Sequence, residues 1–211
     1  MSAPFPRAEA TGRLTDTRQA GGVVMHDVDL HGAAMVTGAA RGIGALYAER
    51  FALRGRDLIL VAGDRAALED MAERLRPRRV RIELVVADLA QAEDLAAVET
   101  QLRGDDRIAL LVNDGQAGAR GGDASSASRL RTDGAMAARL ARAAAEGFVA
   151  QRHGTILNVA LATDGDRGSL AGFIAFSRSL CEELRPHGVH VKARVHRMPF
   201  PDSSLPRIAS A

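Results

Sequence analysis

The sequence is poor in aromatic residues and in cysteine, and both shortages exclude classes of protein. Among 211 residues there is no tryptophan, one tyrosine (Tyr47) and one cysteine (Cys181). A single cysteine cannot form a disulfide within the chain, nor can it build a cysteine-rich metal site. Because this cysteine usage suits a reducing compartment, we expect a cytoplasmic protein with no metal centre.

Long apolar runs and blocks of like charge are also missing. No stretch approaches the roughly 18 consecutive apolar residues that mark a membrane span, so we expect no membrane partner. The 28 Lys and Arg residues and the 26 Asp and Glu residues are scattered, which leaves a formal net charge of +2. Lys192 is the only lysine. Without a basic block, the sequence does not indicate nucleic-acid binding.

The length suits one domain with a sizeable core and is short for two. Residues 1–28 mix proline, glycine, threonine, arginine and acids, and they lack the apolar core of a signal peptide. We expect this stretch to be a disordered or loosely attached tail. Residues 29–211 then form a single domain.

Within that domain, apolar strand patterns alternate with helical patterns. The expected strands are 33–36, 57–62, 80–87, 108–112, 155–159 and 189–195, and the expected helices are 45–54, 65–75, 92–102, 129–151 and 173–184. Strands that alternate with helices of about 10–15 residues indicate parallel βαβ units with right-handed crossovers. The pattern predicts an α/β fold, a doubly wound parallel sheet with helices on both faces.

A glycine-rich turn, Thr37-Gly38-Ala39-Ala40-Arg41-Gly42-Ile43-Gly44, joins the first strand to the first helix. Glycine lets the backbone turn tightly and lets an anion approach the amides at the start of the helix. The turn therefore predicts a dinucleotide phosphate site at Gly38, Gly42 and Gly44, with the amides near Arg41 and Ile43. The alternative is an ordinary loop between a strand and a helix.

The spacing T-G-x-x-x-G-x-G resembles the cofactor turn of the short-chain dehydrogenase/reductase family, and the resemblance runs from about Leu30 to about Val195. It implies a Rossmann-like, NAD(P)-binding oxidoreductase fold. Relatives that prefer NAD place an acid where this chain has Ala62, and relatives that prefer NADP often place an arginine where it has Gly63. Because Arg41 is typical of NADP-binding relatives, the resemblance favours NADP(H) over NAD(H).

Two further positions match the cofactor site of the family. Asp88, followed by Leu89, resembles the aspartate that contacts adenine after the third strand, although Asp88 also suits a cap of the next helix. Asn113 resembles the first asparagine of the family's N-N-A-G motif. Here the run is Asn113-Asp114-Gly115-Gln116, so only the first position matches.

The resemblance also implies where the catalytic tetrad of the family should stand. Counting back from the 176–189 segment puts the tyrosine position at Asp166 and the lysine position at Leu170. The fifth strand puts the serine position at Leu161, and the long helix before it puts the asparagine position at Asp133. No member of the Asn-Ser-Tyr-Lys tetrad is present at these positions.

Other side chains are candidates to replace the tetrad. Asp166 would serve as an acid or base only with a raised pKa, and a loop aspartate is usually solvated. His187 and His190 lack the partner spacing of a metal site, so we expect both to be solvated. We expect Ser177 to lie on a helix surface and Cys181 to pack against other side chains.

Three functions remain open at this stage. The first is an NAD(P)-binding pseudoenzyme, cofactor sensor or partner subunit, and the second is an active NADP-dependent oxidoreductase with an arrangement foreign to the family. The third is a decayed gene product with no maintained activity.

The shortened sequence also predicts that the C-terminal strand and the substrate lobe of the family are missing. The resemblance implies a homodimer through the two long helices. Five apolar residues would suit burial in such an interface or packing on the chain's own sheet, and the two are compatible: Met136, Leu140, Phe148, Phe173 and Phe176.

Overall fold

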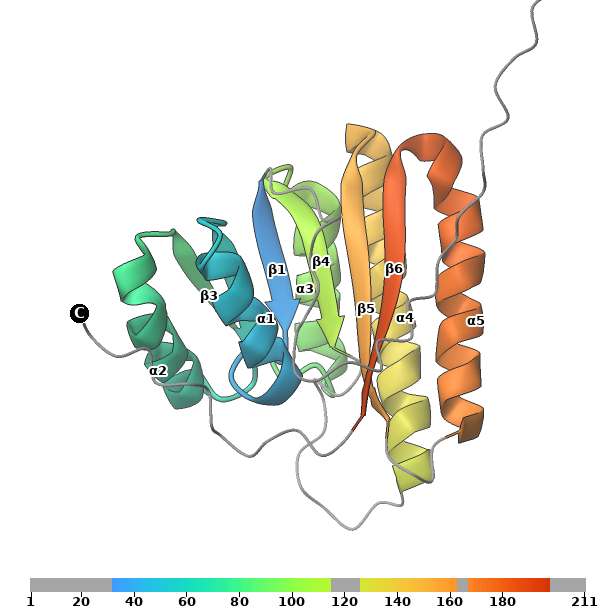
Figure 1. The fold of residues 1–211 in the computed structure, drawn as a ribbon, viewed down its shortest axis with the longest axis horizontal. Coiled ribbons are helices and arrows are strands. Elements are labelled where there is room, and N and C mark those ends of the chain that lie inside the picture. The colour runs from blue at the N-terminus through green and yellow to red at the C-terminus, as the bar shows by residue number, and fades with distance from the viewer. Residues whose placement is uncertain (1–31, 115–125, 163–166, 198–211) are drawn as a thin grey trace, which may run out of the picture.

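The computed structural model describes residues 32–114, 126–162 and 167–197, and it contains one parallel six-stranded sheet (Figure 1). The strand order is β3-β2-β1-β4-β5-β6, which confirms the doubly wound α/β fold. The strands are β1 (Ala33–Thr37), β2 (Leu58–Ala62), β3 (Ile82–Val86), β4 (Ile108–Asp114), β5 (Gly154–Ala162) and β6 (Val189–Arg197). All six point the same way, so their carboxyl ends share one edge.

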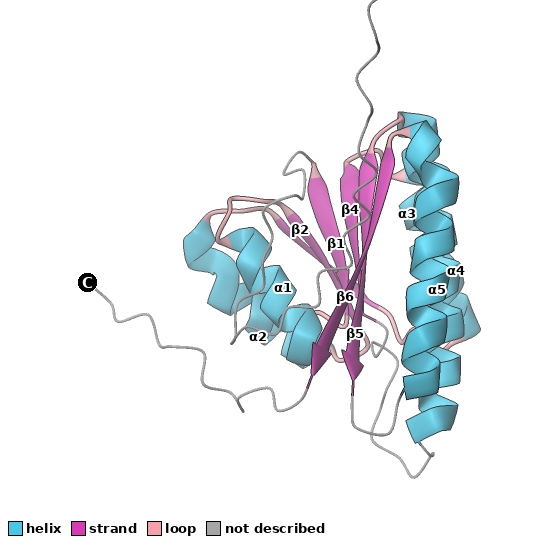
Figure 2. Ribbon diagram, turned by 45° about the vertical axis from the view of Figure 1, so that its right-hand side comes forward, coloured by secondary structure: helices cyan, strands magenta, loops and turns pink. Residues whose placement is uncertain are grey.

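Helices cover the two faces of this sheet unequally. Those on one face are α1 (Gly42–Ala52) and α2 (Arg65–Leu75), and those on the other are α3 (Ala92–Gly104), α4 (Ser126–Gln151) and α5 (Arg167–Leu184) (Figure 2). Short 3₁₀ turns, Arg76–Arg78 and Arg185–His187, follow α2 and α5. Each face has its own apolar core, and the continuous apolar runs of β1, β2 and β4 are buried because helices or neighbouring strands lie on both sides.

Several elements are longer than the sequence pattern predicts. Helix α5 begins at Arg167, six residues before the expected start at 173, and β4 continues to Asp114. The stretch before 173 contains two glycines and a serine, which disfavour helix locally. Packing against the sheet outweighs that weak propensity, because most helical stability in proteins comes from tertiary contacts.

Two expectations about the ends of the chain stay predictions. The tail 1–28 and the residues after 197 lie outside the described part, and so does any further strand there. Among the described helices, none combines the length and apolar character needed to cross a bilayer.

Candidate functional site

The glycine-rich turn lies at the carboxyl edge of the sheet, between β1 and α1. Gly38 and Gly42 have φ angles of 64° and 59°, a left-handed conformation that favours glycine. A Cβ added at Gly44 would clash with the backbone of Gly38, whereas one added at Gly42 would meet no atom within 4 Å. Gly44 therefore lets the helix pack on the turn, and Gly42 leaves the backbone open to a ligand.

The start of α1 is suited to an anion. Arg41 is the N-cap residue with extended backbone, its side chain makes no capping hydrogen bond, and the first turn of the helix contains no acid. The first amides of a helix have no partner within the helix, and the helix dipole adds positive potential there. The described residues thus fit a pyrophosphate at this point.

Arg41 is held by a residue that the sequence analysis missed. Its Nη2 donates a 2.8 Å hydrogen bond to Asp64 Oδ2, and Asp64 Oδ1 accepts from the backbone N–H of Ala67 as the N-cap of α2. The pair spans the carboxyl ends of β1 and β2, where a Rossmann-like fold places the adenosine ribose. A guanidinium suits a ribose phosphate, but a carboxylate suits free ribose hydroxyls, so the pair offers both chemistries. An aspartate immediately before a helix was the available signal.

Asp88 and Leu89 follow β3 at the same edge. Asp88 is half-buried, its backbone N–H donates to Asp94 Oδ2 at 2.7 Å, and its Oδ1 accepts from the N–H of Ala90 at 3.2 Å. The N-cap of α3 is Gln91, so the alternative of Asp88 as the helix cap is wrong. Leu89 is buried in the core.

A buried polar chain connects the end of β4 to α5. Asn113 Nδ2 donates to the backbone O of Ala137 at 2.7 Å and to Asn158 Oδ1 at 3.0 Å, and Asn158 Nδ2 donates to Ser177 Oγ at 3.0 Å. All three of these side chains are buried. The expectation that Ser177 lies on a helix surface is therefore wrong, because the amide of Asn158 needs a buried partner.

The turn and the end of β4 are joined by a second buried contact. The backbone N–H of Asp114 donates to Thr37 Oγ1 at 2.9 Å. Thr37, the last residue of β1, is itself fully buried. Through this bond the first residue of the glycine-rich turn supports the carboxyl end of β4, where Asn113 lies.

Of the four positions expected to hold the tetrad, the structure describes one side chain. Leu170 lies half-buried in α5. Asp133 lies in α4 and Leu161 in β5, with side chains outside the described set, and Asp166 lies outside the described residues altogether. At the lysine position the chain thus has an uncharged aliphatic group.

Tyr47 is the only tyrosine of the chain. It is buried on α1, as expected for packing, and its hydroxyl lies 3.1 Å from His196 Nε2, a contact that the sequence did not predict. Burial raises the pKa of Tyr47 to about 12; Arg194 lowers this pKa and Asp114 raises it. Proton exchange near neutral pH needs the opposite shift.

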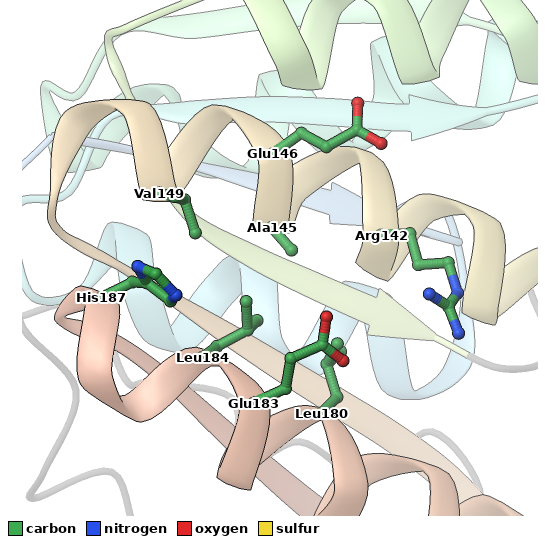
Figure 3. A pocket seen from close by; sticks show the side chains of 8 residues that line it. All are labelled: Arg142, Ala145, Glu146, Val149, Leu180, Glu183, Leu184 and His187. Atoms are coloured by element: carbon green, nitrogen blue, oxygen red, sulfur yellow. The ribbon is translucent and has the colours of Figure 1, made fainter.

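A groove lies between α4 and α5 (Figure 3), and these helices cover the face of the sheet opposite α1 (Figure 2). Its volume is about 440 Å³. Apolar side chains from both helices line it, flanked by Arg142 and Glu146 on α4, by Glu183 on α5 and by His187 in the turn after α5. We call this the α4–α5 groove.

The apolar residues expected at a dimer interface divide into two groups. Met136, Leu140 and Phe148 are buried in the chain's own core, so they pack on its sheet. Phe173 and Phe176 are half-buried on α5.

Three further side chains, from α5 to β6, were expected to be solvated or packed. His187 and His190 are exposed, and Cys181 is half-buried against the core. Across the part of the chain that is described, no group of three or more His, Cys, Asp or Glu side chains is placed to hold a metal ion.

Comparison with known proteins identifies relatives of this architecture. The profile of the short chain dehydrogenase family matches residues 32–195. The short-chain reductase protein NovJ of Streptomyces niveus is 35% identical over 175 residues, covering 76% of this chain and 66% of that protein. The chain thus spans about two thirds of the length of that relative.

Two solved structures are similar in fold and sequence. The bulky-bulky ketone specific alcohol dehydrogenase from Comamonas testosteroni has a TM-score of 0.70 and 36% identity, covering 80% of this chain and 76% of that one. A short-chain dehydrogenase from Sphingobium yanoikuyae, solved in complex with NADPH, has a TM-score of 0.67 and 40% identity, covering 79% and 71%.

Proposed function

The chain belongs to the short-chain dehydrogenase/reductase family, and we propose that it binds NADP(H) at the glycine-rich turn but has lost the hydride-transfer residues of the family. The binding of NADP(H) is supported by the start of α1. There the space beside Gly42 is open, and the first turn of the helix has no acid that would repel an anion. The NADPH complex of the Sphingobium relative supports the same cofactor.

The residues that would hold the cofactor follow from the geometry. Gly38, Gly42 and the amide of Ile43 would face the pyrophosphate, and Arg41 would turn from Asp64 to the phosphate of the adenosine ribose. Asp88 and Leu89 would border the adenine. Asn113 would support the carboxyl edge of the sheet beneath the rest of the cofactor. When bound, the nicotinamide supplies or accepts a hydride.

The second half of the proposal rests on the tetrad positions. A hydride transfer to a carbonyl needs a group that exchanges a proton with the substrate oxygen and a neighbouring charge that sets its pKa. Leu170 provides no charge, and Asp133, Leu161 and Asp166 replace the other three members. The function we favour is that of a pseudoenzyme, acting as a cofactor sensor or as one subunit of a larger assembly.

The second candidate is an active NADP-dependent oxidoreductase with its own catalytic arrangement. One observation favours it: His196 stands at the carboxyl end of β6, hydrogen-bonded to Tyr47, and burial together with Arg194 lowers its pKa. A neutral imidazole at this edge is able to take up a proton.

The α4–α5 groove leads us to extend the proposal to a homodimer. Its apolar floor and its flanking charges of both signs suit a second copy related by a two-fold axis, since Arg142 of one copy would meet an acid of the other. Sedimentation at several concentrations tests this. Val149→Glu, at a half-buried floor position, should shift the population to monomer, and the double variant Arg54→Glu/Arg65→Glu, on exposed sites of the opposite face, should not. A wild-type monomer at all concentrations contradicts the dimer.

The cytoplasmic location stays a prediction from the cysteine usage.

One titration tests the cofactor site. With no tryptophan in the chain, Tyr47 emission reports energy transfer to bound NADPH. Gly42→Asp should abolish binding, because it adds a negative charge where the pyrophosphate would lie. Gly104→Asp, at an exposed glycine with open space at the end of α3, is the matched control and should bind normally. If the wild-type protein binds neither NADPH nor NADH, the proposal fails.

A turnover assay separates the two candidates. Protein saturated with NADPH is mixed with a panel of aldehydes and ketones, and absorbance at 340 nm is followed. If the protein is a pseudoenzyme, NADPH should be oxidised no faster than in the absence of protein. Oxidation that depends on the carbonyl and disappears in His196→Gln would favour the active enzyme.

A further inference from the structure

Strand β3 lies at one edge of the sheet, and within the described ranges its only neighbouring strand is β2 (Figure 1). At its start, Arg81 O accepts from the N–H of Leu58 at 2.8 Å. Just past its end, the N–H of Ala87 donates to Ala62 O at 3.0 Å. Backbone groups alternate in direction along a parallel strand. The N–H and C=O groups of every second residue therefore point away from the sheet: Ile82, Leu84 and Val86.

Strand β3 is also more open than the central strands. All residues of β1, β2 and β4 are buried, whereas every residue of β3 is partly or largely exposed, and Val86 is 38% exposed. Natural edge strands are commonly protected by lysine, proline or a bulge. Strand β3 has no lysine or proline, and its pairing with β2 has no shift of register. This edge is therefore able to accept another strand.

A cluster of arginines comes directly before this strand. Residues 74–81 contain five arginines, so the expectation that blocks of like charge are missing fails locally. Glutamates attract three of them: Arg74 and Arg78 lie near Glu49, and Arg76 pairs with Glu73. The other two arginines, at 79 and 81, are exposed.

The guanidinium groups of Arg79 and Arg81 make no hydrogen bond or ion pair with any residue that the structure describes. Their backbone is nevertheless fixed. Arg79 has a left-handed φ of 57° as the C-cap of the 3₁₀ turn, and its N–H donates to Arg76 O at 3.2 Å. The N–H of Arg81 donates to Asp57 Oδ1 at 2.9 Å. Two cationic groups are thus presented from a held backbone, which lowers the entropic cost of binding an anion.

An open strand edge beside two available guanidinium groups suits an extended, acidic ligand. The edge offers hydrogen bonds to a peptide backbone, and arginine binds a carboxylate through paired hydrogen bonds. A single-stranded nucleic acid fits this surface less well, because its bases stack on aromatic side chains. Residues 73–89 contain no phenylalanine, tyrosine, tryptophan or histidine. The chemistry of the surface therefore favours a peptide.

We propose that β3 accepts an extended acidic segment of a partner protein as an additional strand. The partner backbone bonds to the outward groups of Ile82, Leu84 and Val86, and its carboxylates bond to Arg79 and Arg81. These arginines precede β3 at the amino edge of the sheet, whereas the glycine-rich turn follows β1 at the carboxyl edge. The interaction is therefore independent of the proposed cofactor site.

A labelled peptide tests the strand addition. The probe carries two aspartates followed by alternating valine and threonine, and fluorescence anisotropy follows its binding to the full chain. Two versions N-methylated at alternate residues block one or the other edge of the peptide, and one of them should bind roughly tenfold more weakly. Asparagine in place of both aspartates should cause a similar loss. Absence of saturable binding, or equal binding of all versions, overturns the proposal.

Two pairs of protein variants locate the site. Val86→Pro removes an outward N–H and leaves the bonds to β2 intact, so it should weaken peptide binding, whereas Val86→Thr keeps this N–H and should bind normally. Arg79→Glu/Arg81→Glu should weaken binding roughly tenfold or more. The matched reversal Arg178→Glu/Arg185→Glu, on exposed positions of α5 and the turn after it, should not. Circular dichroism verifies that each variant is folded, and equal affinity across the folded variants contradicts the site.

Amide exchange measured by NMR reads the strand directly. The outward amides of Ile82, Leu84 and Val86 should exchange fast in the protein alone and slow by roughly tenfold when the peptide is added, while Glu83 and Val85, bonded to β2, should change little. Outward amides already protected in the protein alone would mean that the chain itself or a second copy covers β3, and the proposal would fail. Displacement of the peptide by an equal concentration of oligothymidylate would assign the arginines to nucleic acid and overturn it.

Discussion

Arg41 of the phosphate turn and Asp64 at the start of α2 form an ion pair with an N–O distance of 2.8 Å across the ends of β1 and β2. Both side chains are largely exposed, so the pair itself adds little to stability. Under the proposed binding of NADP(H), the pair would act in cofactor choice, because the guanidinium would exchange Asp64 for a ribose phosphate while the carboxylate stays close to the ribose.

The first prediction concerns this choice. Arg41→Ala should weaken NADPH binding by about tenfold to a hundredfold, the value of one charge-assisted contact, and should leave NADH binding nearly unchanged. Asp64→Asn should strengthen NADPH relative to NADH, since asparagine still caps α2 but lacks the negative charge. Titration of each variant with both nucleotides measures the ratio. Equal losses for both nucleotides in Arg41→Ala would assign Arg41 to the pyrophosphate instead.

The second prediction concerns the packing of α1 on its turn. Gly44→Ala should lower the free energy of unfolding by about 1–3 kcal/mol, because the new methyl group meets the backbone of Gly38. Gly104→Ala has no such neighbour, and it should be neutral or stabilising by up to about 1 kcal/mol. Urea unfolding followed by circular dichroism compares the two variants. Equal stability of both would show that the turn relaxes without cost.

The third prediction uses Tyr47 as its own reporter. Absorbance at 295 nm should titrate with a midpoint near the pKa of about 12 in the folded protein and near 10 in urea. Because the folded state keeps this proton longer, the stability it confers is complete below pH 10. It is lost as the pH rises toward 12, by about 2–3 kcal/mol. Tyr47→Phe should flatten this part of the stability profile. A native midpoint near 10 would mean that the hydroxyl is not buried.

The fourth prediction tests the buried polar chain. Ser177→Ala removes the oxygen that accepts from Asn158 Nδ2 and leaves a buried donor without a partner, so it should cost about 1–3 kcal/mol. Ser179→Ala, at an exposed position two residues later on α5, should change stability by less than about 0.5 kcal/mol. Thermal unfolding of both variants checks the difference. The same small effect at both positions would return Ser177 to the helix surface.

Features that depend on neighbours in the chain were predictable from the sequence. Strands and helices follow from the period of apolar residues, and the phosphate turn follows from glycine spacing between a strand pattern and a helix pattern. The beginning of α5 was placed too late because its first residues are poor helix formers, and their helix depends on packing that local propensity does not contain.

The sequence by itself determined the order of strands and helices and the turn between β1 and α1. Only the tertiary structure decided which side chains meet. Tyr47 and His196 are separated by 149 positions, and Asn158 and Ser177 lie on different elements, yet each pair shares a hydrogen bond. Sheet register and helix packing bring such residues together. Both depend on contacts between distant segments, so the residue pattern of one segment does not predict them.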